Sequence, residues 1–256
     1  MNNRKFLIFI RVIEYFVFYL LILLLSSRMS FSYLDLNRAS ENTRLIINII
    51  QHLFSLLIIL FLANMLNKIT LDNIGYSKDK KITKFSRGFI MGSLSVTILI
   101  FVYSMVYGVH FGFRQNIIVG VVLLGFFATL IQSLSEEVVF RGVLLKIMSS
   151  ERGIWVGVLV SSVLFGLLHA FNSNFSLSAL IVLFVAGIFY SLYKIKLDNG
   201  SLWGVFGFHT AWNFIQEFIL KNNFPQAGFK NAIGALIIFI LLSIIVYKTG
   251  LRQNPA

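Results

Sequence analysis

The chain has 256 residues, of which 57% are hydrophobic and only 12% are charged, and its mean hydropathy is +0.84. A soluble globular chain is only about half apolar. Several apolar runs here reach the roughly 20 residues that a helix needs to cross about 30 Å of hydrocarbon. These numbers exclude an ordinary soluble enzyme and predict a polytopic membrane protein. The absence of cysteine excludes disulfides, thiolate metal sites and a cysteine nucleophile.

The formal net charge of +12 would suit a nucleic-acid partner in a soluble protein. In a membrane protein, basic residues instead hold the cytoplasmic loops beside anionic lipid. We therefore expect the lipid bilayer as a partner and no nucleic acid.

The apolar runs predict an all-α fold, a bundle of about eight transmembrane helices that forms a single domain over residues 1–256. The first run has no small-residue cleavage site after it, so we expect a retained span. Both prolines, Pro225 and Pro255, fall outside the spans. The predicted spans are Phe6–Ser26, Leu45–Leu66, Gly88–Tyr107, Ile117–Val139, Ile154–Ala170, Leu177–Tyr193, Leu202–Leu220 and Ala232–Tyr247.

The distribution of Lys and Arg residues predicts the orientation of the chain in the membrane. With a cytoplasmic N-terminus, fifteen Lys and Arg residues fall in inside segments and six in outside segments. This bias places both termini in the cytoplasm, as does an even number of spans. The apparent enrichment in Ile, Phe, Asn and Lys suits an AT-rich genome, and we expect a bacterial cytoplasmic membrane.

Two adjacent carboxylates lie at the end of the fourth apolar run, in the stretch Glu136-Glu137-Val138-Val139-Phe140-Arg141. A charge at the centre of a membrane costs about 3 kcal/mol on insertion scales, so such groups usually mark function. Glu137 and Arg141 are i, i+4, the favourable order for a helical ion pair. The side chain of Glu136 points about 100° round the helix from that of Glu137. This geometry predicts that Glu137 pairs with Arg141 and that Glu136 is left to exchange a proton.

Three further polar residues follow on two later spans. The fifth span ends at His169, and the seventh carries His209 and Asn213, which are i, i+4 and share a face. Side chains of this kind need hydrogen-bond partners that lipid lacks, so we expect them to face the bundle interior. A carboxylate, two imidazoles and an amide are able to activate a water and hold an oxyanion, which is the equipment of a hydrolase.

Other polar residues of the spans give weaker signals. His52 is expected at the interface near the outer end of the second span, and Glu217, one turn beyond Asn213, is a weaker candidate to line the same cavity. Gly88 and Gly92 open the third span at the four-residue spacing that lets helices approach closely.

The three motifs together resemble the CPBP family, the CAAX proteases and bacteriocin-processing enzymes also called Abi. That family carries Glu-Glu-x-x-x-Arg, Phe-x-x-x-His and His-x-x-x-Asn on successive membrane helices. All three are complete here, as Glu136-Glu137-x-x-x-Arg141, Phe165-x-x-x-His169 and His209-x-x-x-Asn213. The region they cover runs from about residue 117 to 220.

The resemblance implies an intramembrane endopeptidase with a polar cavity between its helices. It implies that Glu136 and His169 polarise the attacking water and that His209 and Asn213 hold the oxyanion. Glu137 and Arg141 would then shape the site. Zn²⁺ bound by Glu136, His169 and His209 is one reading. The His-Glu-x-x-His spacing is absent, however, and a metal-free, glutamate-dependent mechanism is favoured.

The expected substrate is a peptide or a membrane-anchored protein that enters from the membrane or the cytoplasm. Family context offers peptide-pheromone or bacteriocin maturation, bacteriocin immunity and CAAX-type processing, and the sequence selects none of them. Two alternatives stay open: a proton-coupled transporter, and a non-enzymatic adaptor that regulates a partner protein.

The predicted span ends put Glu136 near the inner surface and His169 near the outer one. The apolar residues after Arg141 suggest that the fourth helix continues to about Ser149, which would bring the two closer.

Overall fold

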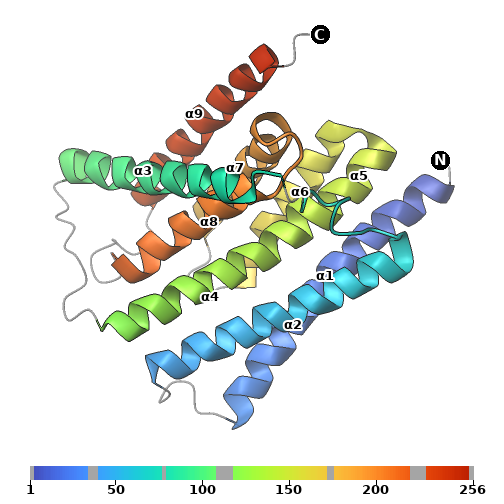
Figure 1. Cartoon of the computed structure of the whole chain (residues 1–256), viewed down its shortest axis with the longest axis horizontal. Helices are drawn as coiled ribbons and strands as arrows, with labels where there is room; N and C mark the ends of the chain where they lie inside the picture. The colour runs from blue at the N-terminus through green and yellow to red at the C-terminus, as the bar shows by residue number, and fades with distance from the viewer. Residues whose placement is uncertain are drawn as a thin grey trace.

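The computed structural model describes residues 3–33, 40–76, 79–107, 118–171, 176–219 and 229–253. Every regular element in these ranges is helical, which confirms the all-α prediction. Figure 1 shows α4 and α5 as one long helix through the middle, with α1 and α2 on one side of it and α3, α8 and α9 on the other. The helices are α1 (Asn3–Tyr33), α2 (Glu41–Asn67), α3 (Lys81–Tyr107), α4 (Val119–Glu137), α5 (Leu145–Arg152), α6 (Ile154–Leu168), α7 (Leu177–Leu192), α8 (Trp203–Phe214) and α9 (Phe229–Gln253).

Four shorter elements continue these helices. Three are π-helical turns, in which the backbone is wider than in an α-helix, and one is a 3₁₀ turn. They are η1 (Val138–Leu144) between α4 and α5, the 3₁₀ turn η2 (His169–Phe171) after α6, η3 (Tyr193–Leu197) after α7 and η4 (Ile215–Ile219) after α8.

Among the described residues, six helical segments are long and apolar enough to cross a membrane, so the chain is a multi-pass membrane protein. They match six of the predicted spans. The other two predicted spans correspond to shorter helices, since α6 has 15 residues and α8 has 12. Every residue of α8 from Gly204 to Trp212 is buried. Packed against α3, α4 and η4, α8 lies inside the bundle rather than across lipid along its whole length.

The fourth span is longer than predicted. Helix α4 continues through η1 into α5, and the apolar stretch runs from Val119 to Arg152 over 34 residues. The predicted end at Val139 is therefore wrong, and the suggested continuation to about Ser149 is confirmed. Val143, Leu144 and Leu145, which follow Arg141, are all buried and continue the core. Glu136 and Glu137 thus lie midway along the span and not at its inner end.

The outer surface of α2 is apolar. Ile50, Leu57 and Phe61 expose 59%, 65% and 65% of their surface, whereas His52 and Ser55 on the same helix are buried. A soluble helix shows the reverse pattern. Apolar side chains directed outward and polar ones directed inward are what a lipid environment favours.

Helices α3 and α8 pack through glycines. A Cβ atom on Gly88 would overlap the carbonyl oxygen of Gly204, and one on Gly92 would overlap that of Phe208. The predicted small-residue pair therefore does let two backbones meet, in a region where helices associate by packing alone.

The start of α8 is fixed by the turn at Asp198-Asn199-Gly200. Asn199 and Gly200 have φ values of 50° and 83°. Asp198 accepts a hydrogen bond of 2.7 Å from the Gly204 N–H and pairs with Arg87 of α3. Burial raises the pKa of the Asp198 carboxyl, while the Arg87 charge opposes that rise. This turn therefore ties the beginning of α8 to α3.

Candidate active site

Glu136 and Glu137 are almost completely buried, with 2% and 0% of their surface exposed. They end α4 at the point where η1 begins. Helices α2, α6 and α8 pack around this part of the chain. The predicted site residues from three separate helices are brought together here.

Glu137 is the hub of a buried ion-pair network. Its Oε1 accepts a hydrogen bond of 3.0 Å from Arg141 Nη1 and lies 2.8 Å from His209 Nδ1. An imidazole nitrogen that faces a carboxylate carries its proton there, so Nδ1–H of His209 donates to Glu137. One carboxylate oxygen thereby orients both a cation and a histidine.

Arg141 is also held by aromatic rings. Its guanidinium carbon lies 4.1 Å from the centre of the Phe165 ring and 4.9 Å from that of Tyr190. A guanidinium stacks on aromatic faces and gains about 0.5–2 kcal/mol from each such contact. The ring of His209 stacks on Tyr190 at 5.0 Å and meets Phe165 edge-on at 5.9 Å. These contacts fix Arg141 and His209 in one arrangement.

Glu136 has a different environment. Its Oε1 accepts a hydrogen bond of 3.1 Å from Gln132 Nε2, and its Oε2 is buried without a hydrogen-bond partner. His209 Nε2 lies 3.8 Å from Oε2, which is too long for a hydrogen bond. His169 also interacts with Glu136 electrostatically. Oε2 is thus the oxygen that is free to take a proton from another molecule.

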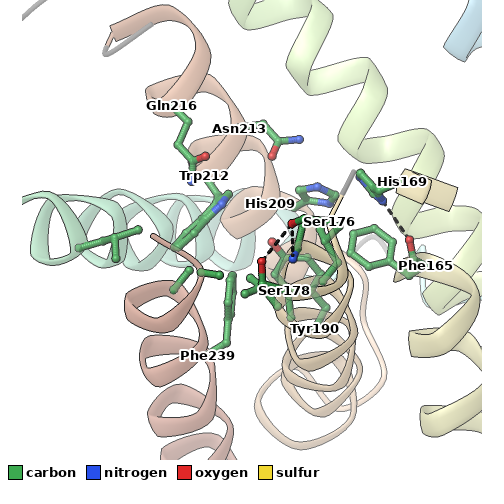
Figure 2. Close-up of a pocket in the computed structure, with 17 residues that line it drawn as sticks. Phe165, His169, Ser176, Ser178, Tyr190, His209, Trp212, Asn213, Gln216 and Phe239 are labelled. Atoms are coloured by element: carbon green, nitrogen blue, oxygen red, sulfur yellow. Dashed lines mark hydrogen bonds between the residues drawn. The ribbon is translucent and has the colours of Figure 1, made fainter. Parts of the chain in front are cut away.

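His169 and Asn213 complete the group. His169 Nδ1 lies 3.0 Å from the carbonyl oxygen of Phe165, which only accepts, so Nδ1 donates and Nε2 is left for the site. His169, His209 and Asn213 all line a cavity of about 280 Å³ between α7, α8 and α9. Figure 2 shows His209 and Asn213 projecting from one helix toward the side on which His169 lies. Most of the remaining lining is apolar, including Leu183, Trp212 and Phe239.

Lys194 is a contributor that the sequence analysis missed. It is buried in η3, and its Nζ donates a hydrogen bond of 2.6 Å to the carbonyl oxygen of Arg141 within η1. It therefore braces the wide turn that follows the two glutamates. A lysine inside an apolar span needs a partner, so the sequence could in principle have indicated this contact. The predicted span, however, ended one residue before Lys194.

Two weaker expectations are wrong. His52 is not interfacial: it is 7% exposed and interacts electrostatically with Glu136. Glu217 does not line the cavity of Asn213; it lines a separate pocket with Gln132, while its neighbour Gln216 lines the cavity. The π-helical turn η4, which begins after Phe214, changes which side chains follow Asn213 on its face.

The side chains of the site do not group as a metal ion requires. Within the described ranges, no three or more His, Asp or Glu side chains are grouped closely enough to hold one. Glu136, His169 and His209 as they lie here do not form the zinc site considered above, so no step is derived through a metal.

Comparison with known proteins agrees with the motifs. No curated protein matches the sequence. Residues 118–215 match the family described as Rce1-like, type II CAAX prenyl endopeptidase Rce1-like. This segment contains all six predicted site residues, from Glu136 to Asn213, and the match confirms the resemblance to the CAAX proteases. The helical core of this chain, residues 118–215, is therefore similar to the Rce1-like family of type II CAAX prenyl endopeptidases.

Proposed function

We propose that this protein is an intramembrane endopeptidase that cleaves a peptide or a membrane-anchored protein with a water activated by Glu136. The observation that carries the proposal is the contrast between two adjacent buried carboxylates. Glu137 Oε1 is held by both Arg141 and His209, whereas Glu136 Oε1 accepts only from the neutral Gln132 amide and Glu136 Oε2 has no hydrogen-bond partner beside two histidines. A general base needs a free lone pair within reach of its proton donor.

The reaction follows from these positions. Glu136 Oε2 takes a proton from a water, whose oxygen adds to the scissile carbonyl. The bare Nε2 of His169 accepts a hydrogen bond from the same water and orients it. The C–N bond then breaks as Glu136 returns the proton to the leaving nitrogen. One water is consumed for each bond cleaved.

The negative charge that develops on the carbonyl oxygen needs hydrogen-bond donors. The Asn213 amide supplies an N–H, and His209 Nε2 supplies a second when its ring is protonated. Glu137 stabilises the imidazolium through Nδ1 and holds the ring in place. Preorganised donors of this kind are each worth about 10²–10³ in rate.

The apolar cavity beside these donors supports a substrate with apolar side chains next to the scissile bond. Its volume of about 280 Å³ exceeds that of a single large side chain, and pockets of this size and lining bind apolar groups. A peptide that enters from the lipid between α7 and α9 would reach His209 and Asn213 directly.

The test compares the peptides that membranes release, by mass spectrometry, for the wild type, Glu136→Ala and Glu14→Ala. Glu14 is an exposed carboxylate of the first span and serves as the matched control. We expect a set of peptides from the wild type and Glu14→Ala that Glu136→Ala does not release. Identical sets from all three would overturn the proposal.

The same assay addresses the metal. Because the described side chains do not form a metal-binding group, we expect a zinc chelator to leave peptide release unchanged. Loss of release with the chelator and its recovery on adding Zn²⁺ would show that a metal takes part.

A further inference from the structure

A second polar surface leads to Glu136 from the side opposite the substrate cavity. On α2, Arg44, Asn48 and His52 follow at four-residue spacing and so share one helix face. Helix α2 packs against α4, and the side chains of Ile46 and Ile50, between these polar positions, are instead 48% and 59% exposed. The polar stripe of α2 therefore faces the bundle.

Helix α4 presents a matching stripe. Thr129, Gln132 and Glu136 recur at three- and four-residue spacing, and Gln132 is hydrogen-bonded to Glu136. A pocket of about 220 Å³ lies where the two stripes meet, and Arg44, Asn48, Thr129 and Gln132 line it together with Glu217. One water takes roughly 30 Å³ in the liquid, so the pocket holds several.

Buried polar atoms without partners continue this line inward. They are Asn48 Oδ1, His52 Nδ1 and Glu136 Oε2, and each is buried without a hydrogen-bond partner. His52 and Glu136 also interact electrostatically. Native structures pair nearly all such atoms with protein or with ordered water. Three of them in succession, from the pocket lining to Glu136 itself, therefore point to water.

We propose that α2 and α4 enclose a hydrated passage that supplies water to Glu136, with His52 of α2 at its inner end. The passage explains how a hydrolase with an apolar substrate cavity obtains the one water that each turnover consumes. Substrate and water then reach Glu136 from different sides, the substrate along α7–α9 and the water between α2 and α4. Its role as the source of the nucleophile rests on the proposed function.

The absence of native cysteine permits a direct test. Asn48→Cys and Thr129→Cys place a thiol in the passage, from α2 and α4 respectively. Ile50→Cys and Phe127→Cys are the matched controls, because each lies two residues away and exposes more than half of its side chain to lipid. The probe is a small, permanently cationic methanethiosulfonate, added to detergent-free vesicles that have been made permeable by freezing and thawing.

The methanethiosulfonate reacts with the thiolate and not with the neutral thiol. Apolar surroundings raise the thiol pKa, and each unit of that rise lowers the thiolate fraction tenfold. We expect both passage thiols to react at least about tenfold faster than both controls. Labelling after denaturation in detergent normalises for expression, and the second variant covers a failure of the first to fold.

If both passage thiols react no faster than the lipid-facing controls, the passage is not hydrated and the inference is wrong. The assay contains no substrate, so it does not depend on catalysis. Fast labelling combined with unchanged peptide release by Glu136→Ala would keep the passage and sink the peptidase proposal instead.

Discussion

Glu136 and Glu137 are neighbours in sequence but make different contacts. Glu137 accepts a hydrogen bond from Arg141 and lies against His209 Nδ1. Glu136 accepts a hydrogen bond only from Gln132, through one of its two oxygens. The difference arises because successive residues of a helix point about 100° apart. One carboxylate can therefore build the site while the other stays available for chemistry.

This contrast predicts distinct effects for two equivalent substitutions. Glu137→Gln leaves the buried Arg141 without its counter-charge, which costs about 3–5 kcal/mol of the free energy of unfolding. Glu136→Gln keeps the bond from Gln132 and should change stability by less than about 1 kcal/mol. It should nonetheless reduce peptide release by about 10²–10⁴-fold.

Thermal unfolding in detergent, together with the mass-spectrometric assay, separates the two effects. Equal losses of both stability and peptide release in the two variants would contradict the division of roles.

At the scale of elements, close helix packing and wide turns position the site. The glycines of α3 and α8 bring the two backbones into contact, and α8 carries His209 and Asn213. The π-helical turn η1 follows the glutamates directly, and Lys194 of η3 holds its carbonyl at Arg141. The helices thus widen at the site although the described helices contain no proline.

The packing of α3 against α8 predicts the result of adding one methyl group. Gly88→Ala would force a Cβ into the Gly204 carbonyl, and such overpacking costs about 1–3 kcal/mol. Gly120→Ala, on α4, is the matched control, since no atom lies within 4 Å of its added Cβ. Gly120→Ala should leave the free energy of unfolding unchanged or raise it by about 0.5–1 kcal/mol.

The melting temperatures of the two variants in detergent check this prediction. A Gly88→Ala protein as stable as Gly120→Ala would mean that α3 and α8 are not in backbone contact.

At the scale of the whole molecule, the bundle separates lipid-facing and water-facing surfaces. The start of α1 and the end of α9 lie toward the same end of the bundle in Figure 1, as an even number of crossings requires. The charge count needs one revision, because Arg141 and Lys194 are buried in the core rather than in inside segments. Without these two, the inside segments hold thirteen basic residues against six outside, and the bias still favours cytoplasmic termini.

Reporter fusions measure this orientation. A fluorescent protein that matures only in the cytoplasm should fluoresce at the C-terminus. An alkaline phosphatase that is active only outside should be active when fused after Arg114, between α3 and α4. Phosphatase activity at the C-terminus would reverse the predicted orientation.

The sequence by itself determined the membrane class and the helical fold, and it indicated the six candidate site residues. Each of these follows from local pattern: runs of apolar residues, and polar residues at i, i+4 spacing within them. The three motifs also indicated the family, because together they are far more specific than any one of them.

Only the tertiary structure decided the depth of the glutamates and the identity of their further neighbours. A charge usually marks the membrane surface, so the sequence places Arg141 just beyond the end of a span. In the structure, Glu137, Phe165 and Tyr190 compensate this charge inside the core. His52 and Lys194 reach the site from α2 and η3, and pairing between distant helices leaves no trace in local spacing. Periodicity shows which face of a helix is polar, but only packing shows what that face meets.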